Sequence, residues 1–186
     1  MEVLNVFSAF GLSSAAGLNA YLPLLVVALT ARFTDLIQLY EPWDVLTSWW
    51  VIGVLAALLL IEMTVDKIPA ADSVNDVIHT AIRPVAGAIL FAANSGAVGQ
   101  VHPVLAMICG LLVAGGVHAV KATARPVVTA TTMGAGNWLI SIIEDIVSFV
   151  TSVLAILVPV LLVFLIVLFL LGAGWWWSKR RASYAG

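Results

Sequence analysis

The sequence is poor in charged residues. Only 10% of its 186 residues are charged and 62% are hydrophobic, whereas a soluble globular domain carries about 25% charged residues. The mean hydropathy is +1.11, which excludes an ordinary soluble domain and indicates an integral membrane protein. At about 20 residues per transmembrane helix, the length allows roughly five to seven helices and no sizeable soluble domain.

Basic charge and cysteine are scarce as well. The net charge is −2, so the chain offers no basic surface and we expect no nucleic-acid partner. The single cysteine, Cys109, has no partner for an intramolecular disulfide. The N-terminus, MEVLNVF, has an acid where a signal peptide has basic residues, so the first apolar segment is expected to be retained. No phosphate-binding loop, HExxH or CxxC motif occurs, and the sequence predicts no established cofactor.

The first apolar segment contains the sequence GLSSAAGLNAYLP, from Gly11 to Pro23. Its small residues would let another helix approach closely. Pro23 has no N–H to donate to the carbonyl of Asn19, so polar backbone is freed beside a polar side chain. We therefore expect a broken helix here, with Asn19 and Tyr21 contributing to a binding site.

Hydropathy divides the chain into six candidate membrane spans, at about 7–29, 50–65, 84–93, 103–120, 127–147 and 153–171. The turn between the last two, at Thr151 and Ser152, is weakly marked, and one long helix over residues 138–174 is the alternative. Six spans place seven of the eight basic residues on the same side as both termini and only Arg32 opposite, as the positive-inside rule expects. Those seven are Lys67, Arg83, Lys121, Arg125, Lys179, Arg180 and Arg181. The sequence thus predicts an all-α, multi-pass protein of the cell inner (cytoplasmic) membrane with cytoplasmic N- and C-termini.

An internal repeat is suggested by two ten-residue segments. Residues 11–20 and 110–119 are identical at five of ten positions, and the alignment pairs Asn19 with His118. Glu62 and Glu144 occupy similar positions in their spans. A repeat of three spans would be inverted, as in many secondary transporters. We expect two inverted three-helix repeats, at about 5–98 and 102–178, in a single membrane domain of residues 1–186; a chance match of glycine and alanine is the alternative.

Asp72, Asp76, His79 and Arg83 are spaced four, three and four residues apart, so they share one face of a helix. Two carboxylates and an imidazole could hold a divalent cation, with Asp72, Asp76 and His79 as ligands, or relay a proton. The alternative is an amphipathic helix at the membrane surface with solvated carboxylates. The sequence leaves open whether this face is buried or interfacial.

Acidic residues also occur near the ends of two predicted spans. Glu62 and Asp66 lie one helical turn apart, and Glu144 lies late in the fifth span. An unpaired charge at the centre of a span costs roughly 2.5–3.5 kcal/mol, so Glu62 should be paired, protonated or hydrated. We predict a transport or proton-coupling role for Glu62 and Glu144, with Asn19 and His118 close together at mid-depth.

Together these features predict a small membrane transporter for a small polar solute or cation, coupled to a proton or cation. A Mg²⁺-dependent membrane enzyme acting on a lipid-linked phosphate is one alternative, with Asp72 and Asp76 holding the metal. A structural or assembly subunit that docks a protein partner is another. The lipid bilayer is an expected partner in every case, and assembly as a homodimer is left open.

GLNAYLP, together with the pattern DKIPxxDxxxDxxHTxxRPxxGA between Asp66 and Ala88, resembles a family of bacterial membrane proteins, domain of unknown function 4126 (DUF4126). The resemblance covers nearly the whole chain and implies no particular activity. A weaker likeness joins the segment from Glu62 to Lys67 to the acidic E-x-G-D-K-T motif of cation/proton exchangers of the lysine-exporter superfamily. That likeness implies two inverted three-helix repeats, but the motif glycine is absent here, and Ser148 stands where Asp66 would repeat.

Overall fold

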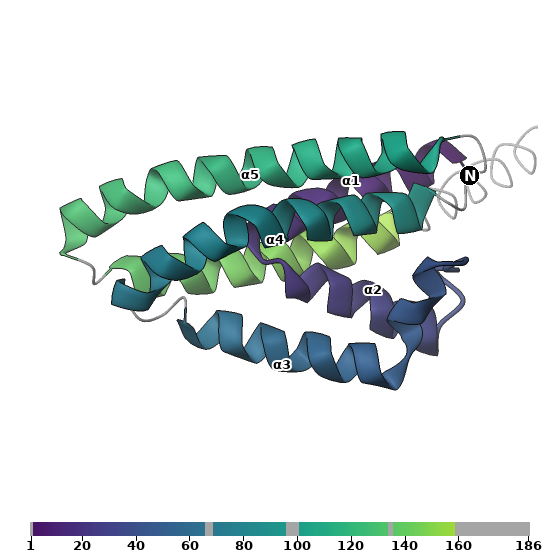
Figure 1. Cartoon of the computed structure of the whole chain (residues 1–186), viewed down its shortest axis with the longest axis horizontal. Helices are drawn as coiled ribbons and strands as arrows, with labels where there is room; N and C mark the ends of the chain where they lie inside the picture. The colour runs from purple at the N-terminus through teal and green to yellow at the C-terminus, as the bar shows by residue number, and fades with distance from the viewer. Residues whose placement is uncertain (1, 66–68, 96–100, 134–135, 159–186) are drawn as a thin grey trace, which may run out of the picture.

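The computed structural model describes residues 2–65, 69–95, 101–133 and 136–158 (Figure 1). All regular elements in these ranges are helical, which confirms the all-α prediction. They are α1 (Glu2–Leu18), α2 (Tyr21–Phe33), a short 3₁₀ helix η1 (Trp43–Thr47), α3 (Trp49–Val65), α4 (Pro69–Ser95), α5 (Pro103–Thr132) and the Gly136–Val158 helix.

The first apolar segment folds as two helices, α1 and α2, separated by a break at Asn19 and Ala20. The side-chain oxygen of Asn19 accepts hydrogen bonds from the backbone N–H groups of Tyr21 (3.2 Å) and Leu22 (2.9 Å), which caps α2. Pro23 lies in the first turn of α2, where its missing N–H costs no helix bond. The predicted break is therefore present.

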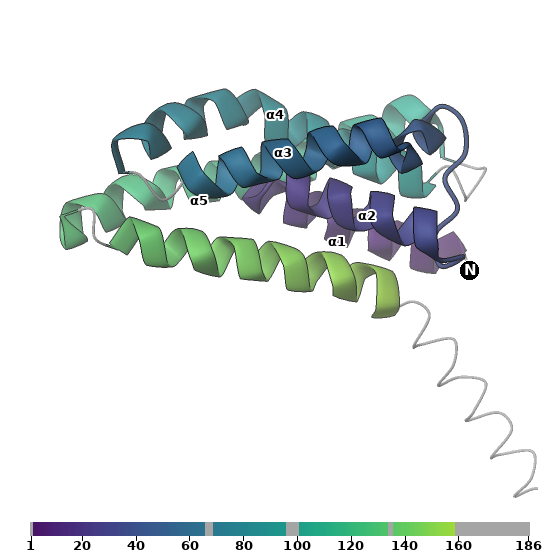
Figure 2. The same cartoon turned by 90° about the horizontal axis from the view of Figure 1, so that it is seen from below.

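The two half-helices form a hairpin that does not cross the bundle. Figures 1 and 2 show α1 running inward from the end that holds the N-terminus and α2 returning toward that end. The expected single span over residues 7–29 is therefore a hairpin of two helices. The loop that follows α2 lies at the same end as the N-terminus, whereas the six-span prediction placed it on the opposite side.

The later helices each run along the bundle, as Figures 1 and 2 show. Helix α3 packs beside α2, and α4 packs most extensively on α5 and α1. Small residues permit this packing. A Cβ atom added to Gly110 of α5 would lie 2.2 Å from the carbonyl oxygen of Gly87 in α4, and one added to Gly17 of α1 would lie 2.6 Å from the carbonyl oxygen of Ala114. The close approach expected at the small residues of α1 is thus present at Gly17.

Two predicted interruptions are wrong: the short basic turn implied between the spans 103–120 and 127–147, and the turn at Thr151 and Ser152. Helix α5 continues through Lys121 and Arg125 to Thr132 and ends at Met133, which adopts a left-handed φ of 54°. Lys121 and Arg125 are buried, so their charges belong to the interior of the bundle and mark no loop.

The other wrong turn lies at Thr151 and Ser152, which the Gly136–Val158 helix passes without a break. The hydroxyl of Ser152 donates to the carbonyl of Ser148, whose own hydroxyl donates to the carbonyl of Ala15 in α1. The Ser152 hydroxyl is hydrogen-bonded within its own helix and the Ser148 hydroxyl is hydrogen-bonded to α1, so neither residue interrupts the helix. For residues 138–158 the single-helix alternative is correct.

The inverted repeat is not confirmed. Helix α5 is continuous at His118 and Ala119, the residues aligned with Asn19 and Ala20, so the break of the first segment does not recur. Arg83, Lys121 and Arg125 lie inside helices, where they do not count as loop charges. Only four of the seven basic residues therefore remain as loop or terminal charges that support the predicted orientation in the membrane.

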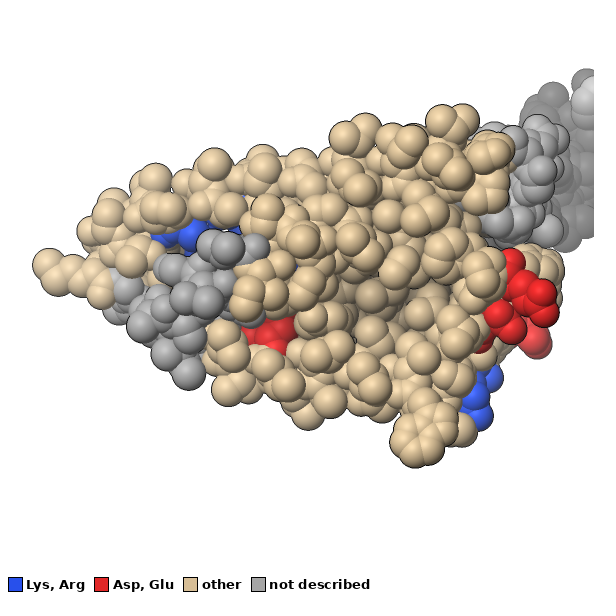
Figure 3. Space-filling model, in the orientation of Figure 1, with Lys and Arg blue, Asp and Glu red and all other residues tan. Residues whose placement is uncertain are grey.

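The outer surface is suited to lipid. Within the described residues, two helices are long and apolar enough to cross a membrane, Pro103–Thr132 and Gly136–Val158. Both expose many large apolar side chains. Figure 3 shows one group of charged side chains at the right end of the visible face and smaller recessed patches, one blue and one red, in its left half; most of the remaining surface carries no Asp, Glu, Lys or Arg. These features are consistent with a membrane protein.

Candidate functional site

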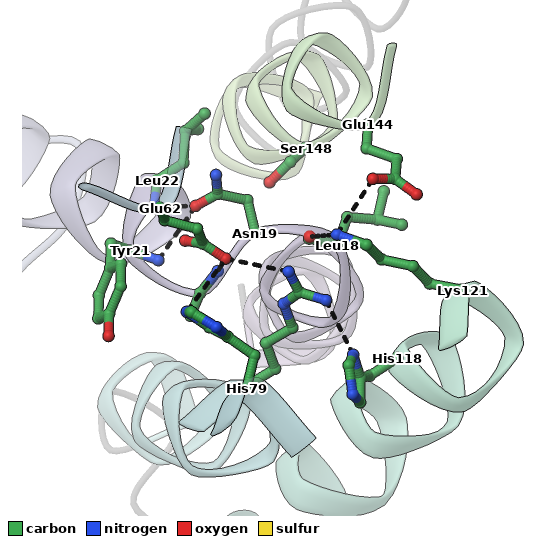
Figure 4. Close-up of polar contacts among 12 residues, drawn as sticks. Leu18, Asn19, Tyr21, Leu22, Glu62, His79, His118, Lys121, Glu144 and Ser148 are labelled. Atoms are coloured by element: carbon green, nitrogen blue, oxygen red, sulfur yellow. Dashed lines mark hydrogen bonds and ion pairs between the residues drawn. The ribbon is translucent and has the colours of Figure 1, made fainter. Parts of the chain in front are cut away.

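The tip of the α1–α2 hairpin presents two helix ends to the interior. The carbonyl oxygen of Leu18, at the C-terminal end of α1, accepts a hydrogen bond of 3.2 Å from the Lys121 ammonium. The backbone N–H of Ala20, just before α2, points to the Glu62 carboxylate at 3.5 Å. Each side-chain charge is opposite in sign to the partial charge of the helix end that it meets: Lys121 meets the negative end of α1, and Glu62 meets the positive end of α2 (Figure 4).

Glu62 is the centre of the first polar cluster and is fully buried. Its Oε1 atom lies 3.1 Å from Nη2 of Arg83 and 3.4 Å from Nε2 of His79. Arg83 is fully buried too. Both ions are removed from solvent, so each stabilises the charge of the other. Removing either charge would leave the other buried without compensation.

His118 extends this cluster from α5. Its Nδ1 atom lies 2.9 Å from Nη1 of Arg83, and its Nε2 atom lies 3.1 Å from the hydroxyl of Thr80. An arginine side chain only donates, so Nδ1 of His118 is the acceptor and carries no proton. The imidazole is therefore neutral, and its Nε2 faces the Thr80 hydroxyl.

Tyr21 lies at the edge of the cluster, on the first turn of α2. Its ring packs edge-on against the ring of His79, with 5.8 Å between centroids. Figure 4 shows both side chains on the side of Glu62 that faces away from Lys121. The Tyr21 ring therefore flanks the first polar cluster on its α2 side.

A second polar cluster joins α5 to the Gly136–Val158 helix. The carboxylate of Glu144 lies 3.0 Å from the ammonium of Lys121 and also accepts a hydrogen bond from Arg125. The neighbouring Asp145 accepts a hydrogen bond of 3.0 Å from the side-chain amide of Asn19. Lys121, bound to both Glu144 and the end of α1, connects this cluster to the hairpin tip.

The structure brings most of the predicted site residues together around the hairpin tip. Those placed in the two clusters or directly beside them are Asn19, Tyr21, Glu62, His79, Arg83, His118 and Glu144. The helical face that ends in His79 and Arg83 is buried at these two residues.

The predicted metal site is not tested. Asp66 lies outside the described residues, and the side chains of Asp72 and Asp76 on α4 do too, although their backbone is described. The imidazole of His79 is directed to Glu62. Within the part of the chain that the structure describes, no group of three or more His, Cys, Asp or Glu residues could hold a metal ion.

Asn19 and His118 were expected to lie close together at mid-depth. Both are buried, and both border the hairpin tip in Figure 4. Their hydrogen-bond partners differ: Asn19 bonds to Asp145, and His118 contacts Arg83. They belong to one interior polar region, which rules out an arrangement with each facing lipid.

Sequence reasoning missed part of this region. Asp145 was not selected as a site residue, and Lys121 and Arg125 were assigned to a turn. A signal for the first omission exists: Asn137, Ser141, Asp145, Ser148 and Ser152 follow a spacing of four, four, three and four. All five are buried, so this stripe is the face that the Gly136–Val158 helix turns toward the bundle.

The chain belongs to the family described as Domain of unknown function (DUF4126), whose model matches residues 6–179. No curated protein and no solved structure was found to match the chain. The family resemblance inferred from the sequence motifs is therefore confirmed. The likeness to lysine-exporter-superfamily exchangers has no support in these comparisons.

Proposed function

We propose that this protein is a small membrane transporter coupled to protons, with its central site at the tip of the α1–α2 hairpin. The observation that carries the proposal is the environment of Glu62, a fully buried carboxylate between the start of α2, Arg83 and His79. Ionisable groups buried inside membrane proteins commonly mark substrate and proton paths. Helices interrupted within the bundle, with their ends directed at charged groups, are typical of secondary transporters.

The contacts of Glu62 suggest how a proton would act. When Glu62 is ionised, its negative charge attracts Arg83 and the N-terminal end of α2. A proton delivered through His79 would neutralise the carboxylate and remove this attraction. The hairpin tip and α4 would then separate more easily, which supplies a change in structure that depends on protonation.

A proton fits this site better than a metal ion. Glu62 lies against Arg83, and Glu144 lies against both Lys121 and Arg125. A cation that approached either carboxylate would be repelled by the fixed positive charge already beside it. A proton avoids this repulsion because it adds to the carboxylate itself.

The proposal can be tested without knowing the solute. Wild-type proteoliposomes on a solid-supported membrane should give a transient current when the external pH is changed stepwise, because protons enter the buried network. Glu62→Gln removes the titrating carboxylate and should abolish the transient, and His79→Gln should slow it. Glu41→Gln is the matched control, since Glu41 is an exposed loop carboxylate, and should behave as the wild type.

Two results would oppose the proposal. One is a pH-step current of equal size in protein-free liposomes, in the wild type and in Glu62→Gln. The other is saturable Mn²⁺ uptake, followed with a trapped metal-sensitive dye, that does not change the internal pH. The second result would favour cation transport without proton coupling.

Localisation in a bacterial inner (cytoplasmic) membrane, with both termini cytoplasmic, is part of the proposal. Lys179, Arg180 and Arg181 follow three tryptophans near the C-terminus. Such a sequence is typical of the cytoplasmic side. An inverted repeat, a homodimer and the Mg²⁺-dependent enzyme remain predictions from the sequence.

A further inference from the structure

A row of four side chains connects the surface of the bundle to the buried carboxylate of Glu62. It begins at Thr80 of α4, which is exposed, and continues through His118 and Arg83, which are buried. The Thr80 hydroxyl lies 3.1 Å from Nε2 of His118, and Nδ1 of His118 lies 2.9 Å from Nη1 of Arg83. Nη2 of the same guanidinium lies 3.1 Å from Oε1 of Glu62. The Arg83 guanidinium is thus held from two sides, by α3 and by α5.

The hydrogen bonds in this row have a fixed direction. Arg83 can only donate, so Nδ1 of His118 accepts and carries no proton. In a neutral imidazole the proton then lies on Nε2, which donates to the oxygen of the Thr80 hydroxyl. The hydrogen bond at one ring nitrogen decides the state of the other. Thr80 therefore favours the tautomer in which Nδ1 is available to Arg83.

We propose that His118 is a positioning residue that Thr80 holds in one tautomer and that anchors the Arg83 guanidinium on α5, against Glu62. This inference rests on the proposed function and deepens it, because it gives the two buried histidines different roles. His79 lies 3.4 Å from the Glu62 carboxylate and exchanges the proton with it. His118 acts on Glu62 through Arg83 and carries no proton itself.

The anchor decides which contact opens when Glu62 is neutralised. Arg83 is then a fully buried cation whose carboxylate partner has lost its charge. His118 still supplies an acceptor for it on α5. Helices α4 and α5 also approach closely at Gly87 and Gly110. The pair of helices α4 and α5 therefore stays together, and the hairpin tip is the part that is released.

Two other roles for His118 fit these contacts less well. A proton taken up at Nδ1 would face the positive guanidinium of Arg83, and arginine does not give up a proton to pass it on. His118 is therefore poorly placed as a proton relay to Glu62. A role in packing alone would need neither an acceptor at Nδ1 nor the Thr80 hydroxyl.

Substitutions of His118 distinguish the three roles in the pH-step measurement. His118→Asn keeps an acceptor, because the amide oxygen can take the place of Nδ1, but it cannot be protonated. It should leave the transient current close to that of the wild type. His118→Leu should reduce the transient by about ten-fold or more, since a hydrogen bond to a charged group is one of the stronger kinds. If His118→Leu does not fold, His118→Asn and the Thr80 variants still decide the result.

Substitutions of Thr80 test the tautomer directly. Nitrogen NMR of protein labelled at histidine should show His118, assigned by its absence in His118→Asn, as a single neutral tautomer with the proton on Nε2. Thr80→Val should mix the two tautomers and reduce the transient current, and Thr80→Ser should restore both. Thr123→Val is the matched control, because Thr123 is exposed on α5 and its hydroxyl bonds within its own helix. It should change neither measurement.

Three results would overturn the proposal. The first is a wild-type His118 that is protonated at neutral pH or carries its proton on Nδ1. The second is a loss of the transient in folded His118→Asn as complete as in Glu62→Gln, which would make His118 a proton carrier. The third is an unchanged tautomer and current in Thr80→Val.

The NMR measurement does not depend on transport, so failure of the positioning role can be told from failure of proton coupling. A normal pH-step current together with mixed tautomers of wild-type His118 would retain the transporter and discard the positioning role. A single tautomer with the proton on Nε2 but no pH-step current would discard proton coupling and support the anchor of Arg83 alone.

Discussion

Asn19 at the hairpin tip donates a hydrogen bond of 3.0 Å to Asp145, which lies 126 residues later on the Gly136–Val158 helix. The oxygen of the same amide accepts from the backbone N–H groups of Tyr21 and Leu22. One side chain therefore both starts α2 and fixes the hairpin tip to a distant helix. The position of the tip depends on Asp145 as much as on the local sequence.

The hydrogen bond between Asn19 and Asp145 predicts that a substitution at one position can restore the stability lost by a substitution at the other. Asn19→Asp would place two buried carboxylates in contact and should lower the free energy of unfolding by about 3–5 kcal/mol. Adding Asp145→Asn should restore most of it, because a carboxylate at 19 still caps α2 and an amide at 145 still donates. Unfolding in mixed SDS micelles measures both. The exposed change Gln38→Glu is the control, and a double variant as unstable as Asn19→Asp would contradict the prediction.

The buried ion pair between Glu62 and Arg83 should be strongly coupled. Arg83→Met leaves a buried carboxylate without its guanidinium and should cost about 3–5 kcal/mol of unfolding free energy. The double variant Glu62→Met/Arg83→Met removes both charges and should cost much less. A double-mutant cycle gives the coupling energy, with the exposed neighbour Ile61→Ala as control. Additive single effects would show that the two charges do not stabilise each other.

The crossing of α4 and α5 should tolerate no side chain at Gly110. A Cβ atom there would overlap the backbone of Gly87, so Gly110→Ala should force the helices apart and cost about 1–3 kcal/mol or more. Gly116→Ala on the same helix is the matched control, because nothing lies within 4 Å of an added Cβ. Thermal unfolding should show a lower Tm for the first and no loss for the second. Equal stability of the two variants would place the crossing elsewhere.

The α1–α2 hairpin makes a topological prediction that differs from six spans. On a Cys109→Ala background, single cysteines at Asn5 and Asp35 should react with a membrane-impermeant maleimide from the same side of the membrane. A cysteine at Met133 should react from the other side. Met133 is exposed and ends α5, and Figure 1 shows this end of α5 opposite the N-terminus. Labelling of positions 5 and 35 from opposite sides would instead indicate that the first segment crosses the membrane.

Much of the local structure was predictable because it depends on neighbouring residues. The break near Pro23 follows from a proline that cannot donate and an asparagine that can cap, and both effects act within a few residues. Helix α3 (Trp49–Val65) matches the expected span because its apolar run is uninterrupted as far as Ile61. The pattern of Asp72, Asp76, His79 and Arg83 correctly indicated one helical face, although it did not reveal where that face lies.

The errors arose where a distant partner changes the cost of a residue. Lys121 and Arg125 indicate a loop when considered alone, since a charge inside an apolar helix is costly. Glu144, on another helix, offsets that cost, and α5 therefore continues through both. In the same way, Ser148 lies in the predicted gap between the spans 127–147 and 153–171, but its hydroxyl donates to the carbonyl of Ala15 in α1 and the helix continues.

The sequence alone determined the all-α class, the family, the apolar character of the chain and the break at Asn19, because each depends on composition, motifs or local hydrogen bonding. The tertiary structure decided that the broken segment turns back as a hairpin and that its tip meets Glu62, Lys121 and Asp145. The physical reason is that a buried charge is tolerated only beside its partner. These partners come from α3, α5 and the Gly136–Val158 helix, which only the folded bundle brings together.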